Sequence, residues 1–267
     1  MTDYVHGYST RESIRLVDQA TTLTELLHSD TIYPPGSRVF EAGCGVGAQT
    51  VILAKNSPEA HFTSIDISPM SLEAAAALIE REKISNVTFQ QADIFGLPFP
   101  AESFDHIFVC FVLEHLKDPA SALRALLPVV KRGGTITVIE GDHGSTYFHP
   151  ESRLAWQTIQ CLIDLQANLG GNSLIGRQLY PLLKNSGFAD ARVSPRMVYV
   201  DSSKPKMVEG FTRNTFIAIV EGVRQQALAD KLMQDAQWEA GISDLYASAG
   251  EDGVFCYTFF KATAVRR

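Results

Sequence analysis

A glycine-rich turn near the start of the chain offers the first candidate chemistry. The apolar run at residues 39–42 leads directly into Gly43, Gly45 and Gly47. Glycines allow positive φ angles and a close approach of backbone to a ligand, and the helix expected after them presents free N–H donors. Gly43, Gly45 and Ala48 also fit the loose pattern of dinucleotide-binding turns. The turn alone therefore predicts a nucleotide-like ligand without choosing its kind.

Two carboxylates follow the next two apolar runs. Asp66 stands 19 residues beyond Gly47, where it can accept hydrogen bonds from both hydroxyls of a ribose. Asp93 could accept a hydrogen bond from the exocyclic amine of adenine, with Ile94 packing on the ring face. Ligands of open parallel sheets bind at the carboxyl ends of the strands. We therefore expect an adenosine-bearing ligand there, and a nicotinamide nucleotide remains an alternative.

Groups that could move a proton follow the fourth and fifth apolar runs. Glu114 and His115 come after the fourth run, and Glu140, Asp142 and His143 come after the fifth. A positioned carboxylate or imidazole can act as a general base on an acceptor that must lose a proton. We select Glu114, His115 and His143 as catalytic candidates. The spacing of the acids and histidines in this region matches no metal-ligand pattern, so we predict no metal.

The elements that must position these residues alternate by type. Short apolar runs predict strands, and helical periodicity with caps such as Ser68-Pro69 predicts the helices between them. The expected strands are 39–42, 62–67, 87–90, 104–112 and 135–140, and the expected helices between them are 48–55, 69–83 and 120–130. This alternation predicts an α/β fold with a doubly wound, mostly parallel sheet. Later strands are expected at 191–200 and 255–264.

Composition narrows the function classes. The chain has 267 residues, 45% of them hydrophobic, and a net charge of -7, which disfavours nucleic acid as a partner. No segment is long and apolar enough to predict membrane insertion. Four widely spaced cysteines favour reduced thiols and a cytoplasmic location. The composition is compatible with a monomer or a homodimer.

Five segments, in order, resemble the motifs of class I S-adenosylmethionine-dependent methyltransferases. They are EAGCGVG at 41–47, SID ending at residue 66, QADI at 91–94, FDHIFVCFVLEHL at 104–116 and KRGGTITVIE at 131–140. The likeness spans about residues 36–140. It is strongest to the subgroup acting on small molecules, similar to the ubiquinone and menaquinone biosynthesis methyltransferases. The resemblance implies S-adenosylmethionine as cofactor and a Rossmann-like sheet of seven strands with a reversed last strand.

The resemblance also implies site residues. Contacts to the cofactor's methionine portion and sulfonium are assigned to Tyr8, Glu41, Gly43, Gly45, Cys110 and Phe111, the contact to its ribose to Asp66, and contacts to its adenine to Ile67, Asp93 and Ile94. Glu41 stands where the family most often has Asp. His115 matches a histidine frequent in the subgroup.

The domain layout follows from where the strand–helix rhythm breaks. We expect an N-terminal helical segment at 1–33 and the cofactor-binding domain at 34–267, with helical cap insertions at about 145–172 and 203–250. Core packing accounts for most apolar cap residues, and the remainder would line a pocket for a small apolar or aromatic acceptor. The alternatives are an NAD(P)-dependent oxidoreductase and a non-catalytic module that binds an adenosyl ligand.

Overall fold

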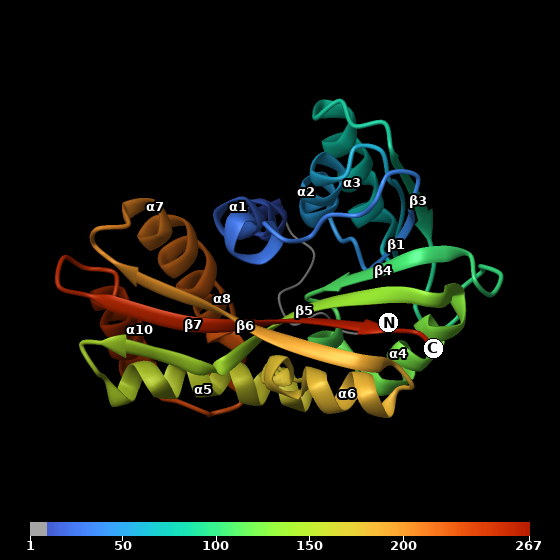
Figure 1. Cartoon of the computed structure of the whole chain (residues 1–267). Coiled ribbons are helices and arrows are strands. Elements are labelled where there is room, and N and C mark those ends of the chain that lie inside the picture. The colour runs from blue at the N-terminus through green and yellow to red at the C-terminus, as the bar shows by residue number, and fades with distance from the viewer. Residues whose placement is uncertain (1–9) are drawn as a thin grey trace.

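A computed structural model describes residues 10–267, with side chains described from Gln19 onward. Its centre is one seven-stranded sheet in the order β3-β2-β1-β4-β5-β7-β6 (Figure 1). The strands are β1 (Arg38–Ala42), β2 (His61–Asp66), β3 (Val87–Gln91), β4 (Phe104–Cys110), β5 (Val130–His149), β6 (Ala189–Asp201) and β7 (Val254–Val265). Strands β1 to β5 pair in parallel, and β7 runs antiparallel between β5 and β6. The predicted doubly wound sheet with a reversed last strand is confirmed.

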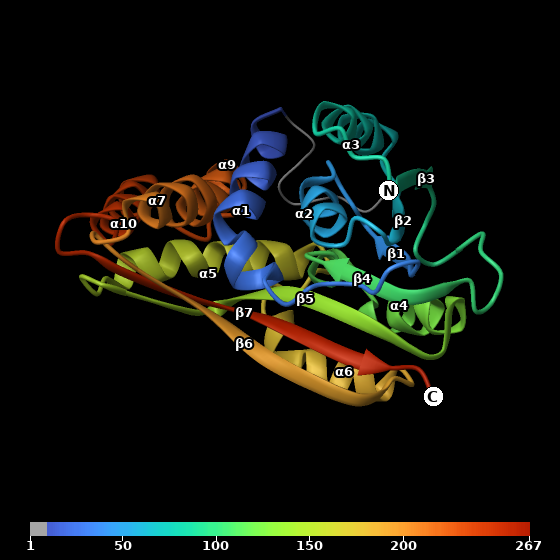
Figure 2. The same ribbon diagram turned by 45° about the horizontal axis from the view of Figure 1, so that its top comes forward.

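Helices cover both faces of this sheet (Figures 1 and 2). The helices α1, α2 and α3 lie on one face, whereas α4, α5 and α6 lie on the other. The α-helices are α1 (Thr10–His28), α2 (Ala48–Asn56), α3 (Pro69–Arg81), α4 (Pro119–Leu126), α5 (Arg153–Asn168), α6 (Leu179–Asn185), α7 (Pro205–Met207), α8 (Ala218–Gly222), α9 (Arg224–Ala229) and α10 (Asp235–Ala247). Three short 3-10 segments, η1 (Leu113–His115), η2 (Leu127–Val129) and η3 (Ile175–Gln178), and a π-helix, η4 (Val208–Ile217), complete the described elements.

Local sequence signals explain where the helices begin. The Ser68 side chain accepts a hydrogen bond from Ser71 N at 3.2 Å, and Pro69 occupies the first turn of α3. Asp118 caps α4 in the same way through Ser121 N at 2.8 Å. The predicted Ser68-Pro69 helix start is therefore confirmed.

The central strands are buried on both faces because helices cover both. Ile107, Phe108 and Val109 of β4 are each fully buried. Successive side chains alternate between the two faces, so Phe108 packs in one hydrophobic cluster and Ile107 in the other. The near-continuous apolar run at 107–113 is explained by this two-sided burial.

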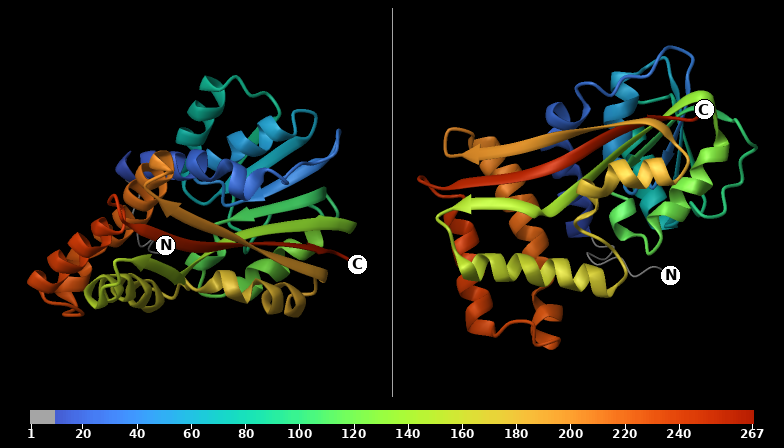
Figure 3. Two further views of the ribbon diagram at one scale, coloured as in Figure 1. Left: turned by 60° about the vertical axis from the view of Figure 1, so that its left-hand side comes forward. Right: turned by 60° about the horizontal axis from the view of Figure 1, so that its bottom comes forward.

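The fifth strand differs from the prediction. Instead of ending near Glu140, β5 continues to His149 and pairs with β7 along most of that length. A register shift separates the pairs Asp142–Thr258 and Tyr147–Cys256, so residues 143–146 form a bulge. Strands β5, β7 and β6 thus run together toward the C-terminal helices (Figure 3). Strand β7 provides hydrogen-bond partners for the backbone of the polar, glycine-containing segment that follows Glu140. The sequence pattern alone indicates a loop there.

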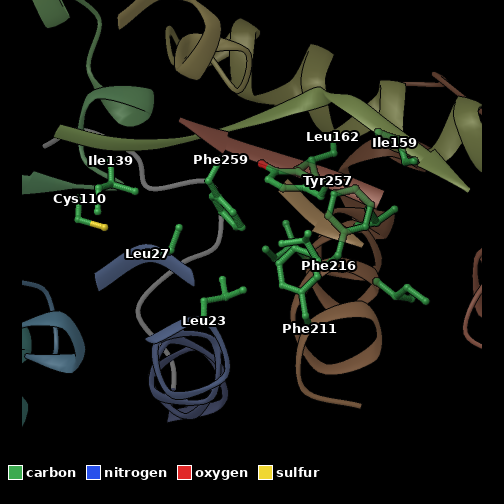
Figure 4. Close-up of a cluster of buried hydrophobic side chains, with 14 of the residues drawn as sticks. Leu23, Leu27, Cys110, Ile139, Ile159, Leu162, Phe211, Phe216, Tyr257 and Phe259 are labelled. Atoms are coloured by element: carbon green, nitrogen blue, oxygen red, sulfur yellow. The ribbon is translucent and has the colours of Figure 1, made fainter. Parts of the chain in front are cut away.

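Helix α1 lies between α2 and the C-terminal helices, above the sheet (Figures 1 and 2). It packs closely on η4, since a Cβ atom added to Gly210 would lie 2.4 Å from Thr22 Oγ1. Leu23 and Leu27 of α1 share a buried cluster with Phe211, Tyr257 and Phe259 (Figure 4). The N-terminal helix, the sheet and the cap helices therefore share one hydrophobic core.

Two further sequence predictions can be compared with the structure. All four cysteines are buried and unpaired, which confirms free thiols. Within the described part of the chain, no helix has the length and apolarity needed to cross a membrane.

Candidate functional site

The glycine turn closes the carboxyl end of β1. Gly43 N and Cys44 N both donate to Ile65 O, at 2.8 and 2.9 Å, which fixes the turn to β2. Gly43, Gly45 and Gly47 all have positive φ. A Cβ atom on Gly43 would lie 2.5 Å from Val112 Cγ2, whereas one on Gly45 would have no neighbour within 4 Å. The backbone at Gly45 is therefore approachable by a ligand, as the sequence predicts.

Asp66 is bound to this turn. Its Oδ2 accepts a hydrogen bond from Gly45 N at 2.9 Å, and its Oδ1 accepts one from Ser68 N at 2.9 Å. The side chain is half-buried. A carboxylate has more than two acceptor sites, so Asp66 can still accept hydrogen bonds from a ligand.

Asp93 lies on the neighbouring strand end of the same sheet edge. Asp66 pairs with Gln91 in the register of β2 and β3, and Ala92 N donates to Asp66 O at 3.2 Å. Asp93 follows directly, is exposed, and accepts a hydrogen bond from Phe95 N at 2.9 Å. The turn, the first acid and the second acid are thus gathered at consecutive strand ends.

Exposed apolar side chains accompany the two acids. Ile67, Met70 and Phe95 have relative exposures of 51%, 65% and 49%. Exposed apolar groups beside polar acceptors suit a flat ring that needs both. Sequence reasoning selected Ile67 and missed the other two, although Phe95 directly follows the QADI segment. Ile94 is half-buried and packs on the core.

Glu41 lies beneath the turn. It is 2% exposed, and its Oε2 accepts hydrogen bonds from Thr50 Oγ1 at 2.7 Å and Ser64 Oγ at 2.6 Å. Burial raises the pKa of Glu41 to about 7, although the two hydroxyls oppose the rise. These bonds connect β1 to α2 and β2. Glu41 therefore helps to position the glycine turn, in addition to its predicted contact with the methionine portion.

Cys110 and Phe111 end β4 beside the turn. Cys110 is buried, and burial raises the pKa of its thiol. Phe111 has φ 56°, which is uncommon for a bulky residue, and its ring lies 5.5 Å from that of Phe259. Such strain is held by surrounding contacts and is concentrated at functional sites.

Glu114 and His115 sit in η1, immediately beyond β4. Glu114 Oε1 and His115 Nε2 are 3.5 Å apart, and both side chains are mostly buried. The Glu114 carbonyl accepts hydrogen bonds from Asn172 N at 2.7 Å and Gln166 Nε2 at 3.1 Å. The predicted pair is therefore held together at the same edge as the glycine turn.

His143 lies in the bulge of β5. Its Nδ1 is 2.8 Å from the Tyr257 hydroxyl. Burial raises the pKa of Tyr257 well above its usual range. The Tyr257 hydroxyl packs over Gly141, where a Cβ atom would lie 2.3 Å away. Tyr257 was not selected from the sequence, because only the β5–β7 pairing brings it to His143.

Asp142 has a structural partner. Its carboxylate accepts two hydrogen bonds from Arg177, from Nε at 2.5 Å and Nη2 at 2.7 Å. The Asp142 side chain is 2% exposed, whereas the Arg177 side chain is 48% exposed. Among the described residues, no group of three or more His, Cys, Asp or Glu is arranged to hold a metal ion.

Most predicted cap residues belong to the core. Of ten apolar residues on the helices expected to form the cap, seven are buried: Ile159, Leu162, Leu165, Phe211, Phe216, Ile217 and Trp238. Trp156 and Ile163 are partly buried, and Tyr246 is 36% exposed. Tyr8, the remaining cofactor candidate, lies outside the described residues.

Comparison with known proteins adds a family match. Residues 40–138 match the family model described as a methyltransferase domain. An uncharacterized 37.1 kDa transposon protein of Streptomyces fradiae is 32% identical over 191 residues, covering 70% of this chain and 54% of that protein. A demethylmenaquinone methyltransferase of Listeria welshimeri is 29% identical over 106 residues, covering 39% of this chain and 45% of that protein. The chain spans about half the length of these curated relatives.

Solved structures share the fold at low identity. The YcgJ protein of Bacillus subtilis superposes with a TM-score of 0.58 at 16% identity, covering 93% of this chain and 98% of that one. A phosphoethanolamine N-methyltransferase of Haemonchus contortus, solved with S-adenosylhomocysteine, gives 0.57 at 17% identity, with coverages of 93% and 52%. The [4+2]-cyclase SpnF gives 0.53 at 23% identity, with coverages of 93% and 81%.

The family match covers the first five strands, where the glycine turn and both acids lie. The remaining strands complete the seven-stranded sheet, and the fold as a whole is similar to that of the solved structures. Residues 40–138 therefore match a methyltransferase domain, and the chain as a whole shares the fold of these solved structures.

Proposed function

We propose that this protein transfers the methyl group of S-adenosylmethionine to a small acceptor. The observation that carries the proposal is the placement of Gly45, Asp66 and Asp93 at consecutive strand ends of one sheet edge. A glycine backbone, a carboxylate for a ribose and a second carboxylate for an adenine amine form a matched set for one nucleoside. The match of residues 40–138 to a methyltransferase domain supports the same ligand.

On the donor side, each residue has a distinct task. Gly43 and Gly45 offer backbone to the methionine portion, with Glu41 bracing the turn from below. Asp66 accepts hydrogen bonds from the ribose, and Ile67 flanks the adenine. Asp93 and Ile94 bind the edge and face of the adenine, while Cys110 and Phe111 lie toward the sulfonium. When bound, S-adenosylmethionine supplies an activated methyl group on a positively charged sulfur.

Methyl transfer from a sulfonium is an in-line displacement, so alignment and exclusion of water are the protein's main contributions. Good alignment can supply on the order of 7 kcal/mol of the barrier. Glu114, His115 and His143 are the proposed groups for accepting a proton if the acceptor loses one. The paired placement of Glu114 with His115 and of His143 with Tyr257 fixes each imidazole.

We infer an apolar or aromatic acceptor from the aromatic core that joins the end of β4 to the cap. Aromatic residues Phe111, Phe259, Tyr257 and Phe216 follow one another from the end of β4 into the cap, with ring centroids 4.7 to 5.6 Å apart. We further propose that the protein is cytoplasmic and that it forms a homodimer.

Donor binding is tested by titration calorimetry with S-adenosylhomocysteine and with NADH. We expect heat with the first ligand only. Asp66→Ala and Asp93→Ala should each weaken binding of S-adenosylhomocysteine. Glu239→Ala, on the exposed surface of α10, is the matched control. Binding of NADH with no response to S-adenosylhomocysteine would replace the proposal with the oxidoreductase alternative.

Catalysis needs a second measurement, because one fold can carry different chemistries. Labelled S-adenosylmethionine is incubated with a panel of phenols, amines and polyprenyl compounds, and label transfer is followed. Label transfer that Asp93→Ala abolishes supports a methyltransferase. Tight donor binding without transfer to any acceptor favours the non-catalytic binding module.

A further inference from the structure

Glu140 occupies a junction that the proposed function does not use. It lies in β5 next to the end of β4 and is fully buried. Its Oε1 accepts hydrogen bonds from Val112 N at 3.0 Å and Leu113 N at 2.7 Å. These are the first two backbone donors after Phe111, whose φ is 56°. One carboxyl oxygen of Glu140 therefore holds the whole β4–η1 turn.

The second oxygen of Glu140 is unusual. Oε2 is buried and has no hydrogen-bond partner among the described residues. No Lys, Arg or His in the described part of the chain forms an ion pair with this carboxyl group. An ionised carboxylate left with a bare, buried oxygen would carry a large desolvation cost.

We propose that Glu140 is a positioning residue held as a neutral carboxylic acid at neutral pH, accepting through Oε1 from the β4–η1 turn and carrying its proton on Oε2. A protonated Oε2 is neutral, so burying it without a partner costs the desolvation of one polar group and not that of a charge. The neutral form therefore keeps both hydrogen bonds to the turn and removes the uncompensated charge.

The titratable surroundings of Glu140 favour the same form. Burial raises the pKa of Glu140 well above its usual range, and the nearby Glu114 carboxylate raises it further. Cys110 of β4 and Tyr257 of β7 also interact electrostatically with Glu140. None of the three neighbours, Glu114, Cys110 and Tyr257, is a cation. The backbone N–H groups of Val112, Leu113 and Glu114 oppose the rise in pKa and do not reverse it.

The turn that Glu140 holds connects the two halves of the site. Val112 packs against Gly43, so that a Cβ atom on Gly43 would lie 2.5 Å from Val112 Cγ2. Glu114 and His115 follow Leu113 directly. Through Val112, Glu140 thus sets the position of the glycine turn that is proposed to bind the methyl donor. Through η1, it sets the position of Glu114 and His115. This consequence rests on the proposed function.

Infrared difference spectroscopy tests the protonation state directly. The wild-type minus Glu140→Gln spectrum at neutral pH should contain the C=O band of a carboxylic acid. In the wild-type minus Glu114→Gln spectrum, the acid band of Glu140 should be the same in both proteins and should therefore cancel. A carboxylate band in place of the acid band for Glu140 would overturn the proposal, whether or not any ligand binds.

Rescue by a neutral isostere tests the positioning role. Gln keeps an acceptor for the two N–H groups and a donor in place of the acid proton, so Glu140→Gln should bind S-adenosylhomocysteine within about threefold of wild type. Glu140→Ala removes the acceptor and should weaken binding by about tenfold or more. If Glu140→Ala does not fold, urea unfolding of Glu140→Gln tests the positioning role instead. We expect Glu140→Gln to unfold at the same urea concentration as the wild type.

The two proposals fail differently. A wild-type protein that does not bind S-adenosylhomocysteine would contradict the proposed function, while the infrared and urea measurements would still decide the state of Glu140. Strong loss of urea resistance or of S-adenosylhomocysteine binding in Glu140→Gln, comparable to that in Glu140→Ala, would show that the charge is required and would refute the neutral acid.

Discussion

Asp66 Oδ2 accepts a hydrogen bond from Gly45 N at 2.9 Å, so the acid at the end of β2 and the glycine turn after β1 form one unit. The other oxygen of Asp66 accepts from Ser68 N, at the start of α3. The carboxylate therefore satisfies two backbone donors at the ends of two elements. Its orientation is set before a ligand arrives, which reduces the ordering cost of binding.

Replacing Asp66 with Asn separates orientation from charge. The Asn side chain keeps one acceptor oxygen, so one of the two backbone donors loses its partner. A hydrogen bond to a charged group contributes about 1.5–3 kcal/mol, so we expect affinity for S-adenosylhomocysteine to fall by about tenfold to a hundredfold. Titration calorimetry gives the value. Unchanged affinity would mean that Asp66 does not contact the ligand.

Gly43 and Gly45 should respond differently to the same substitution. Both have positive φ, so Ala costs about 1–2 kcal/mol of folding free energy at either position. Gly43→Ala also drives a Cβ atom into Val112, which adds about 1–3 kcal/mol of overpacking. Gly45→Ala meets open space and should instead impair ligand binding. Urea unfolding and calorimetry on both variants check this, and equal unfolding free energies would contradict it.

The first half of the fold was predictable because its signals are local. A parallel strand buried on both faces is a short apolar run, and the helix after it begins at a cap such as Ser68. Asp66 and Asp93 could be placed together because parallel strand ends share one edge.

The remainder depends on contacts between residues far apart in the chain. Nothing in the segment after Glu140 indicates that β7 will pair with it, so its continuation to His149 was missed. Tyr257 lies beside His143 because of this β5–β7 pairing, whereas the contact of Glu140 with Val112 N depends on the pairing of β4 with β5. The sequence also could not show that Asp142 forms an ion pair with Arg177, which follows 35 residues later.

Glu41 predicts a defined pH dependence of stability. Its pKa in the folded protein, about 7, is raised above the ordinary value of 4.5. The folded state thus holds the proton more tightly, and this contribution is present below pH 4.5 and is lost as the pH rises through 7. The loss is about 3 kcal/mol at most. Glu41→Gln should flatten the unfolding free energy between these pH values, and an unaltered slope in urea titrations would exclude Glu41 as its source.

Removing Arg177 should expose the cost of a buried carboxylate. Arg177→Met leaves Asp142 buried without its cation. Because half of Arg177 is exposed, we expect a loss of about 2 kcal/mol rather than the larger loss of a fully buried pair. Adding Asp142→Asn to Arg177→Met should recover part of it. A double-mutant cycle in urea measures the coupling, which would be near zero if the pair were independent.

Lys261 anchors the end of α1 to the sheet. It is 4% exposed, and its Nζ donates to Leu27 O at 3.2 Å, Asp30 Oδ1 at 2.5 Å and Thr31 Oγ1 at 2.6 Å. Lys261→Met leaves these acceptors without their donor, which costs about 1–3 kcal/mol for each buried group left unpaired.

The loss should be concentrated in α1, because α1 is joined to the sheet through this contact. We expect hydrogen exchange of the amides at residues 19–28 to accelerate by about tenfold or more in Lys261→Met, while β1 and β4 remain protected. Arg196→Met is the control, since Arg196 binds the same Asp30 carboxylate from a more exposed position. It should accelerate exchange less. Uniform acceleration across the sheet in Lys261→Met would mean that α1 does not open as a separate unit.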